Sequence, residues 1–494
     1  MNHTDSDQPR LKIAGALDLS PSPERAPVTL PDHVGHFIGG QRVPGRDEDR
    51  FESIDPARAE ALASVATANE SEVNRAVGAA REALSGPWGK MDGLERGKYL
   101  YRIARRIQER SRELAIVETR DNGKAIRETR DVDVPLAAAH FFYYAGWADK
   151  LNYALPGRNA SPVGVCGQVI PWNFPLLMAA WKLAPALAAG NTCVLKPAET
   201  TPLSAWVLTE ILQEAGLPPG VVNIVNGAGS TGAALVQHAD VDKVAFTGST
   251  GIGQLILRQL AGSGKKTTME LGGKGAHIVF ADAALDQAVE GIINGIFFNQ
   301  GHVCCAGSRL LVEESIADEF VERLKRRIET LRVGDPMDKN TDVGAINSAE
   351  QHGTICRYLD IGREEGATIW QGSANETPEA GYWVKPTLLL GVSQTNRVVR
   401  EEIFGPVLSV LTFRTPEEAL RKANDTEYGL AAGVWSGNNS RLFEVAHGLN
   451  AGVVWANGYN LFDPTSPFGG VRHSGFGREG GMHGLHAYLK WEAQ

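Results

Sequence analysis

The sequence predicts an α/β fold that contains a doubly wound parallel sheet. Short apolar runs at 163–170, 192–197, 221–227 and 243–248 alternate with longer amphipathic segments. This rhythm is typical of parallel strands joined by crossover helices, which bind ligands at the carboxyl ends of the strands. A second alternating stretch after Gly273 predicts another α/β domain, and 494 residues suffice for two or three domains.

The segment before these strands is predicted to be helical. Apolar residues recur at helical spacing in 71–85 and again in 95–118, which gives each segment one apolar face. The first thirty residues are rich in Asp, Ser, Pro and Arg without an apolar run, which predicts a disordered tail and not a secretory signal. The apolar stretch 174–190 is interrupted by Lys182 and Pro185, which favours a buried helix over a membrane span.

Composition argues against several classes of function. The chain has 49 basic and 58 acidic residues, a net charge of −9, and no basic cluster that would bind a phosphate backbone, so no nucleic-acid partner is expected. The five cysteines lack CxxC spacing, so neither a disulfide framework nor a metal site is predicted. Free thiols fit a reducing cytoplasm, and no pattern indicates a membrane partner.

Cys304 and Glu270 are the candidates for covalent chemistry. Cys304 lies in FNQGHVCCAGSR, and Glu270 lies in TMELGGKGAHIVF. A thiolate and a water-activating carboxylate, each beside glycines that permit close backbone approach, can form and then hydrolyse a thioester. The pattern leaves open which of Cys304 and Cys305 reacts, because most free cysteines are buried structural thiols. It also leaves open a solvent-facing position for Glu270, although an apolar setting would raise the pKa of that carboxyl and suit it to act as a base.

Three further motifs are typical of an oxyanion donor and of a nucleotide site. Asn173, in PWNFP after a predicted strand, either donates its amide to an alkoxide or satisfies its own turn. The run Gly248–Gly253, with GxxGxG spacing before a helix, either faces a pyrophosphate or forms a plain turn. Lys196 and Glu199 follow another strand, where a ligand site and a solvated loop are both reasonable interpretations.

Together these motifs resemble the aldehyde dehydrogenase superfamily, from about His36 to Lys490. Two later segments, EIFGP and SPFGGVRHSGFGREGG, complete the resemblance. It implies a Rossmann-type cofactor domain, an α/β catalytic domain and a short oligomerisation hairpin. The implied boundaries are 1–30 for the disordered tail, 31–148 and 162–272 for the cofactor-binding domain, 273–470 for the catalytic domain, and 149–161 and 484–494 for shortened oligomerisation segments.

The resemblance also assigns roles to residues. Cys304 is the implied nucleophile, because the family's reactive cysteine is followed by one residue and then Ala-Gly-Ser-Arg, and Glu270 is the implied base. The amide of Asn173 and the backbone N–H of Cys304 would form the oxyanion hole, and Glu479 would lie on a proton path. The implied cofactor-binding residues are Ile170, Trp172, Lys196, Glu199, Gly248, Ser249, Gly251, Gly253, Glu402 and Phe404. The implied substrate pocket contains Phe174, Leu177, Met178, Trp181, Phe298, Phe462 and Phe468.

The implied reaction is oxidation of an aldehyde to the carboxylic acid with NAD+, through a thiohemiacetal and a thioester on Cys304. The Glu199 carboxylate would repel a 2′-phosphate by about 4 kcal/mol at an effective dielectric of about 20, which favours NAD over NADP. The aromatic pocket suits an apolar aliphatic or aromatic aldehyde, whereas Asp463 beside Phe462 would suit an aminoaldehyde of the betaine-aldehyde type. A CoA-acylating aldehyde dehydrogenase and a catalytically idle binding or structural homologue are further alternatives.

The chain departs from the commonest family pattern at several positions. His302 stands where glutamine is frequent, and Gly275-Ala276-His277 replaces a usual Ser-Pro-Asn, which affects fine geometry and substrate preference. In tetrameric relatives a long hairpin and a long C-terminal tail join dimers. Here the hairpin segment Leu151–Ser161 is short, and only six residues follow Tyr488. We therefore expect a homodimer or a pairing with a different chain, with a tetramer joined by shorter strands as the alternative.

Overall fold

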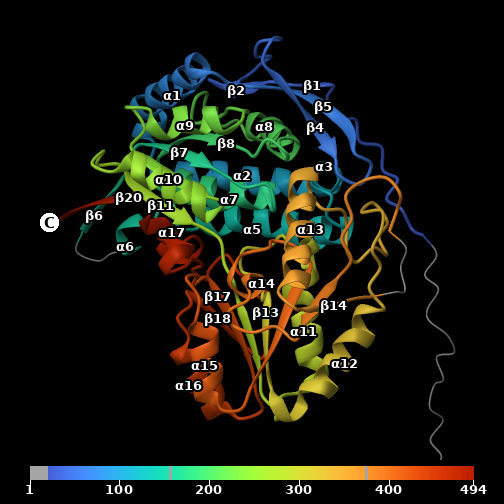
Figure 1. Ribbon diagram of the computed structural model, residues 1–494. Coiled ribbons are helices and arrows are strands. Elements are labelled where there is room, and N and C mark those ends of the chain that lie inside the picture. Colours follow the sequence, from blue (N-terminus) through green and yellow to red (C-terminus); the bar gives the residue numbers. More distant parts are fainter. Residues whose placement is uncertain (1–20, 155–157, 373–376, 494) are drawn as a thin grey trace, which may run out of the picture.

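The computed structural model describes residues 21–154, 158–372 and 377–493, and within them two large sheets organise the chain (Figure 1). The first sheet has the strand order β19-β11-β10-β7-β8-β9-β2-β3. These strands are, in that order, Gly475–Phe476, Lys266–Glu270, Lys243–Thr247, Val165–Val169, Thr192–Lys196, Val222–Ile224, His36–Ile38 and Gln41–Val43.

The first sheet is doubly wound, as predicted. Its strands from β11 to β9 are parallel, and helices cover both of its faces. Because successive side chains of a strand point to opposite faces, Val194 of β8 packs on one side, whereas Cys193 and Leu195 pack on the other. The helices on the side of Val194 are α1 (Glu70–Ser85), α9 (Gly229–Gln237) and α10 (Thr250–Leu260), and those on the other side include α7 (Pro175–Ala188) and α8 (Leu203–Glu214).

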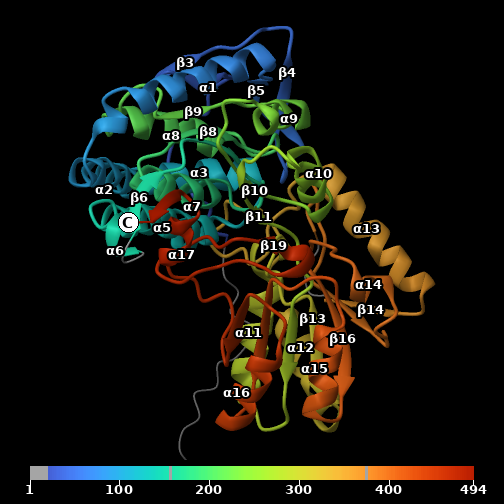
Figure 2. The ribbon, with the colours of Figure 1, turned by 90° about the vertical axis from the view of Figure 1, so that its left-hand side faces the viewer.

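The second sheet has the order β14-β15-β16-β13-β12-β17-β18 and is parallel apart from β14. The chain enters it directly after β11, so residues 271–275 cross from one sheet to the other. Its strands are, in that order, Thr368–Gln371, Thr387–Leu390, Val407–Phe413, Arg309–Glu313, Ala276–Val279, Ala431–Trp435 and Val453–Ala456. Helices α11 (Leu285–Phe297) and α12 (Ala317–Ile328) pack on one face, and α13 (Ala349–Glu364), α15 (Pro416–Asn424) and α16 (Asn439–Gly448) on the other (Figure 2).

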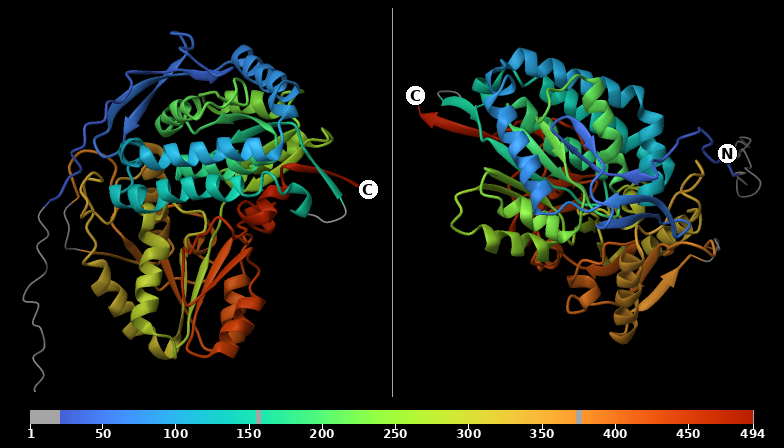
Figure 3. Two further views of the ribbon diagram at one scale, coloured as in Figure 1. Left: turned by 180° about the vertical axis from the view of Figure 1, so that it is seen from behind. Right: turned by 90° about the horizontal axis from the view of Figure 1, so that it is seen from above.

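The predicted helical opening third is only partly correct. Helices α2 (Gly93–Glu109), α3 (Ser111–Asn122) and α5 (Val134–Ala145) do form there, and α2 and α5 pack against α7 (Figure 3). Residues 33–66 instead form strands, among them β1 (His33–Val34), β4 (Arg50–Asp55) and β5 (Glu60–Ala66), which make a separate sheet. The alanines of β5 hid the strand, because alanine favours helices while tertiary burial of alternate residues decides the outcome.

The predicted disordered tail through residue 30 differs from the structure at residues 21–30, and residues 1–20 lie outside the described part of the chain. Glu24 donates its backbone N–H to Met337 O at 2.8 Å, and its nearly buried carboxylate pairs with Arg112 and Lys339. The hydrogen bond from Arg112 lowers the pKa of Glu24 to about 2. Local composition missed this order because its partners lie far away in the sequence.

The two segments predicted as shortened oligomerisation elements pair with each other. Strand β6 (Arg158–Pro162) runs antiparallel to β20 (Leu489–Ala493), from the pair Leu489 and Pro162 to the pair Ala493 and Arg158. This two-stranded ribbon lies at the side of the first sheet, near the C-terminus (Figure 1).

A buried ion pair supports the helices behind α7. Lys124 Nζ lies 2.6 Å from the carboxylate of Asp133, both side chains are fully buried, and the ammonium also lies 4.0 Å from the ring centroid of Phe174. We expect Lys124→Met to reduce the free energy of unfolding by about 3–5 kcal/mol, because it leaves a buried carboxylate without its cation. Urea denaturation measures the change.

The matched control is Lys98→Met, which removes an ion pair with Glu95 in which both side chains are about half exposed. Exposed pairs contribute about 0.2–1 kcal/mol, so this variant should unfold nearly like the parent protein. Equal losses in the two variants would contradict the expected difference.

Candidate active site

A cavity of about 280 Å³ lies where the two sheets meet. Thr247 and Glu270 bring the carboxyl ends of β10 and β11 to its wall, and the segment before β13 brings Cys304. The predicted residues that line it are Trp172, Asn173, Phe174, Leu177, Met178, Trp181, Gly248, Ser249, Glu270, Phe298, Cys304, Glu402, Phe404, Phe462, Phe468 and Glu479. The remaining five predicted site residues, Ile170, Lys196, Glu199, Gly251 and Gly253, lie outside its wall.

Cys304 lies in a turn between α11 and β13. The turn begins with two left-handed residues, Asn299 at φ 49° and Gln300 at φ 53°, which reverse the chain after the helix. The neighbouring Cys305 thiol and burial raise the pKa of Cys304, so that the resting thiol keeps its proton. Among the described residues, none accepts a hydrogen bond from the backbone N–H of Cys304.

Asn173 is held on both sides by the Cys304 turn. Its Nδ2 donates to the backbone O of His302 at 2.8 Å, and its own backbone O accepts from Asn299 Nδ2 at 2.8 Å. An amide has two N–H groups, so one remains for the cavity that Asn173 lines. Two segments that are far apart in the sequence are thereby fixed relative to each other.

Glu270, Glu479 and Lys182 form a buried charged group. Burial and then the charge of Glu479 raise the pKa of Glu270, and Lys182 opposes that rise. Lys182 Nζ contacts the carboxylate of Glu479 and donates to Thr247 Oγ1 at 2.6 Å. Neither carboxylate oxygen of Glu270 has a hydrogen-bond partner among the described residues, so both are available to a molecule in the cavity.

The glycine-rich run begins helix α10 as the sequence predicts. Ser249 caps the helix, its Oγ accepting from Ile252 N at 3.5 Å. At Gly253 a Cβ would lie 2.4 Å from Leu271 Cδ2, so the helix packs closely against the first residue after β11. At Gly251 a Cβ would meet no atom within 4 Å, so the backbone there is open to a ligand.

Lys196 and Glu199 lie at the end of β8, outside the cavity but on the same edge of the first sheet. Lys196 Nζ donates to the backbone O of Pro197 at 2.7 Å and lies 3.5 Å from the Glu199 carboxylate, which is half exposed. Burial lowers the pKa of Lys196, and Glu199 opposes the shift. The pair therefore presents one buried amine and one accessible carboxylate.

Glu402 and Phe404 approach the cavity from the side of the second sheet. Glu402 Oε1 accepts from Gly273 N at 2.9 Å, and burial raises the pKa of Glu402 to about 7. A Cβ on Gly272 would lie 2.2 Å from Glu402 Oε2, so a larger residue there would have to displace the Glu402 carboxylate. Phe404, at φ 56°, meets the ring of Trp172 at 5.3 Å between centroids.

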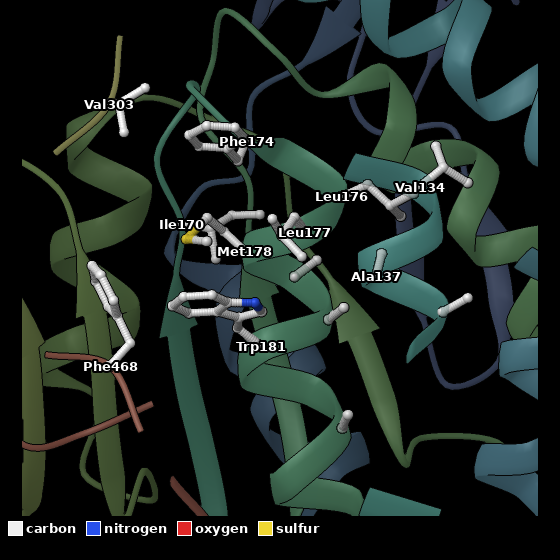
Figure 4. Packing of buried hydrophobic residues seen from close by; sticks show 14 of the residues in the cluster. Val134, Ala137, Ile170, Phe174, Leu176, Leu177, Met178, Trp181, Val303 and Phe468 are labelled. Carbon is white, nitrogen blue, oxygen red and sulfur yellow. The ribbon is translucent and has the colours of Figure 1, made fainter. Parts of the chain in front are cut away.

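Apolar side chains form the rest of the wall. Figure 4 shows Phe174, Met178 and Trp181 on the side of the cavity, opposite Val303 and Phe468, while Leu176 points toward Val134 and Ala137. The Trp181 ring lies 5.4 Å from that of Phe468 and 6.4 Å from that of Phe462.

The sequence analysis missed several residues of the site. In the sequence, Lys182 was used only as evidence against a membrane span. A lysine inside an apolar helix also indicates a buried partner, and that signal was missed. Val132, Leu136, Gln351, Thr354 and Leu430 also line the cavity, and no local motif marks them. Among the residues described, no group of His, Cys, Asp or Glu side chains could hold a metal ion. No helix in the described ranges is long and apolar enough to cross a bilayer.

Comparison with known proteins identifies the family. The profile of the aldehyde dehydrogenase family matches residues 43–493. The chain belongs to the aldehyde dehydrogenase family. It is 46% identical over 464 residues to the putative aldehyde dehydrogenase DhaS of Bacillus subtilis, covering 92% of this chain and 94% of that protein.

Solved structures of other aldehyde dehydrogenases have the same fold. An NAD+ complex of the Bacillus cereus enzyme is 42% identical, with a TM-score of 0.90 over 94% of this chain and 96% of that one. An indole-3-acetaldehyde dehydrogenase of P. syringae is 40% identical, with a TM-score of 0.90 over 94% and 97%. This aldehyde dehydrogenase is NAD-dependent and oxidises an aldehyde to the carboxylic acid.

Proposed function

We propose that Cys304 is the nucleophile, Glu270 the general base and Asn173 an oxyanion donor in this oxidation. The observation that carries the proposal is their convergence on one cavity, although they come from three separate segments of the chain. A thiol, an unpartnered carboxylate and a free amide N–H are the groups that a covalent thioester route needs. The alternative of an idle homologue is disfavoured because the set is complete.

The proposed sequence of events starts from a protonated thiol. The Cys304 thiol loses its proton to solvent, and the Cys304 thiolate attacks the aldehyde carbon to form a thiohemiacetal. Its oxyanion accepts from the Asn173 amide and from the free backbone N–H of Cys304. The tetrahedral carbon then loses a hydride as its oxyanion collapses to the thioester, and NAD+, when bound, would accept that hydride. Glu270 then activates a water that hydrolyses the thioester, and the Lys182–Glu479 pair offers a route for the proton beneath it.

The residues around the cavity fit a dinucleotide. We propose that the open backbone at the start of α10, with Gly248, Ser249, Gly251 and Gly253, holds the pyrophosphate. Lys196 and Glu199 would hold the adenosine ribose, and Ile170 and Trp172 would flank the cofactor. Glu402 and Phe404 would hold the nicotinamide ribose and ring, which explains why Glu402 lines the same cavity as Cys304.

For the substrate we propose an apolar aliphatic or aromatic aldehyde. Aromatic and aliphatic side chains, among them Phe174, Met178 and Trp181 in Figure 4, form much of the wall of the cavity that Cys304 lines. Asp463, which would favour an aminoaldehyde, is exposed, does not line the cavity and accepts from Thr465 N at 2.8 Å. The similarity to an indole-3-acetaldehyde dehydrogenase supports an aromatic substrate. Glu270 in the cavity disfavours a CoA-acylating enzyme, because its proposed task is to activate water.

The division of labour between thiol and base is testable. Cys304→Ala should abolish NADH formation, whereas Glu270→Gln should keep a first-turnover burst and lose steady-state turnover, because the thioester forms but is not hydrolysed. Stopped-flow absorbance of NADH measures both phases. The matched control is Cys305→Ala, which should remain nearly as active as the parent; an inactive Cys305→Ala with an active Cys304→Ala would reverse the assignment.

Glu199 should set the preference for NAD over NADP. We expect Glu199→Ser to reduce the ratio of kcat/KM values for the two cofactors by about tenfold, less than an unscreened charge would give, because the carboxylate is half exposed. Initial rates with both cofactors give the ratio. An unchanged ratio would remove Glu199 from the adenosine site.

The substrate proposal can be tested with a series of aldehydes. Phenylacetaldehyde, hexanal and a trimethylammonium aldehyde differ in charge more than in size, and kcat/KM for each follows from NADH absorbance. We expect the two apolar aldehydes to exceed the cationic one, because aromatic and aliphatic side chains form most of the wall and Asp463 lies outside it. A higher kcat/KM for the cationic aldehyde would favour the aminoaldehyde alternative.

We propose that the chain forms a homodimer, or pairs with a different chain, in the cytoplasm. The ribbon of β6 and β20 is short, with five residues in each strand, which supports a smaller assembly than a dimer of dimers. The free cysteines support a reducing compartment. Light scattering of the purified protein at low micromolar concentration should give the mass of a dimer, and a persistent tetramer mass would contradict the proposal.

A further inference from the structure

We propose that His277 and Tyr459 are positioning residues that fix the turn carrying Cys304. The inference rests on the proposed role of Cys304 as the nucleophile. His277 is the second residue of β12, and Tyr459 lies in the loop that follows β18. Neither residue lines the cavity, so neither touches the reacting atoms.

Tyr459 anchors the residue next to the nucleophile. Its hydroxyl donates to the backbone O of Cys305 at 2.6 Å, and the side chain is buried. Two other backbone bonds shape the same turn, from Ala306 N to Val303 O at 2.9 Å and from Gly307 N to Gly295 O at 3.1 Å. The Tyr459 bond ties this turn to the loop that follows β18.

His277 supports the Tyr459 ring from β12. The two ring centroids lie 4.1 Å apart, and His277 is fully buried. Trp435 Nε1 donates to His277 Nδ1 at 3.4 Å, which leaves the proton of the neutral ring on Nε2. The Trp455 ring also lies against Tyr459, with its centroid 4.5 Å away and its plane tilted by 51°, so two rings contact the phenol. A phenol held in this way can place its hydroxyl in one position only.

Glycines leave the space that these rings occupy. A Cβ on Gly307 would lie 2.1 Å from His277 Nε2, and one on Gly295 would lie 2.5 Å from the same atom. A Cβ on Gly433 would lie 2.8 Å from Tyr459 Cδ2. Backbone from α11, from the end of the Cys304 turn and from β17 thus approaches the two rings directly. A smaller side chain at position 277 would leave a void that these glycines cannot fill.

The consequence is mechanical and not chemical. Burial lowers the pKa of His277 to about 3, so the ring stays neutral over the working range of the enzyme. Its contribution is volume and close ring contact with Tyr459, and the effect on Cys304 passes through the hydroxyl bond to Cys305. The two residues should therefore act as one unit, and removal of the hydroxyl should make the identity of residue 277 irrelevant to the nucleophile.

A double-mutant cycle in the full-length enzyme tests this. Tyr459→Phe removes only the hydroxyl, and His277→Asn removes the support beneath the ring. We expect the first-turnover NADH burst to slow by about tenfold in Tyr459→Phe and about fivefold in His277→Asn, as misplacement of a nucleophile predicts, while KM for NAD stays unchanged. The double variant should be no slower than Tyr459→Phe.

The control is Ile278→Ala, which alters the next residue of β12 but packs on the opposite face of the second sheet. It should lower the melting temperature and keep the parent burst rate, which separates positioning from general stability. A parent burst rate in Tyr459→Phe would overturn the proposal. If the losses in burst rate add up in the double variant, His277 does not act through Tyr459. Because Tyr459→Phe removes a single oxygen, it tests the anchor even if His277→Asn does not fold.

Iodoacetamide labelling distinguishes failure of the positioning inference from failure of the proposed function. Peptide mass spectrometry should find the label on Cys304 when the parent enzyme loses activity. If activity survives full labelling of Cys304, the proposed nucleophile is wrong. If labelling inactivates the enzyme and the Tyr459 variant is unimpaired, only the positioning inference is wrong.

Discussion

A buried ammonium group beside two buried carboxylates is the interaction on which the active site depends. Lys182 extends from α7 to Glu479 and Thr247, and its charge opposes the rise in the pKa of Glu270. Isolated buried ions are costly, and a pair compensates for much of that cost only when the geometry is good. Because burial raises the pKa of Glu270, this carboxylate is a stronger base than an exposed one, while Lys182 keeps the group from carrying two uncompensated charges.

Helix α7 and the residue before it contribute polar and apolar side chains to the active site. Asn173 directly precedes it, Lys182 faces the carboxylates, and Leu177, Met178 and Trp181 form the apolar wall. Residues three and four apart share a helix face, which places Leu177 and Trp181 side by side. The start of α7 is fixed from behind, since Glu118 of α3 accepts from Leu176 N at 3.0 Å. Burial raises the pKa of Glu118 to about 8.

A second buried carboxylate fixes the other half of the site. Glu128, at the end of the short helix α4 (Ile126–Glu128), accepts from Asn299 N at 3.1 Å, where the chain is left-handed. Asn299 in turn donates to the backbone of Asn173. The proposed oxyanion donor and the turn of the proposed nucleophile are thus held by one network that starts from the helices beside the first sheet. Residues 271–275, which cross between the sheets, also contact this turn. A Cβ on Gly273 would lie 2.4 Å from the Cys304 carbonyl oxygen, so the two backbones approach closely there.

The sequence by itself determined the fold class, because strand and helix periodicities are local, and the family, because its motifs are contiguous strings such as those around Glu270 and Cys304. It also singled out a glycine-rich run, in which Gly253 packs closely against Leu271. It could not reveal that Lys182 joins Glu479, that Glu24 meets Arg112, or that His277 supports Tyr459, since each pair is distant in the chain. Nor did it show β5, which lies in the opening part of the chain that was predicted to be helical. Only the tertiary structure decides these points, because burial and pairing depend on which segments the folded chain brings together.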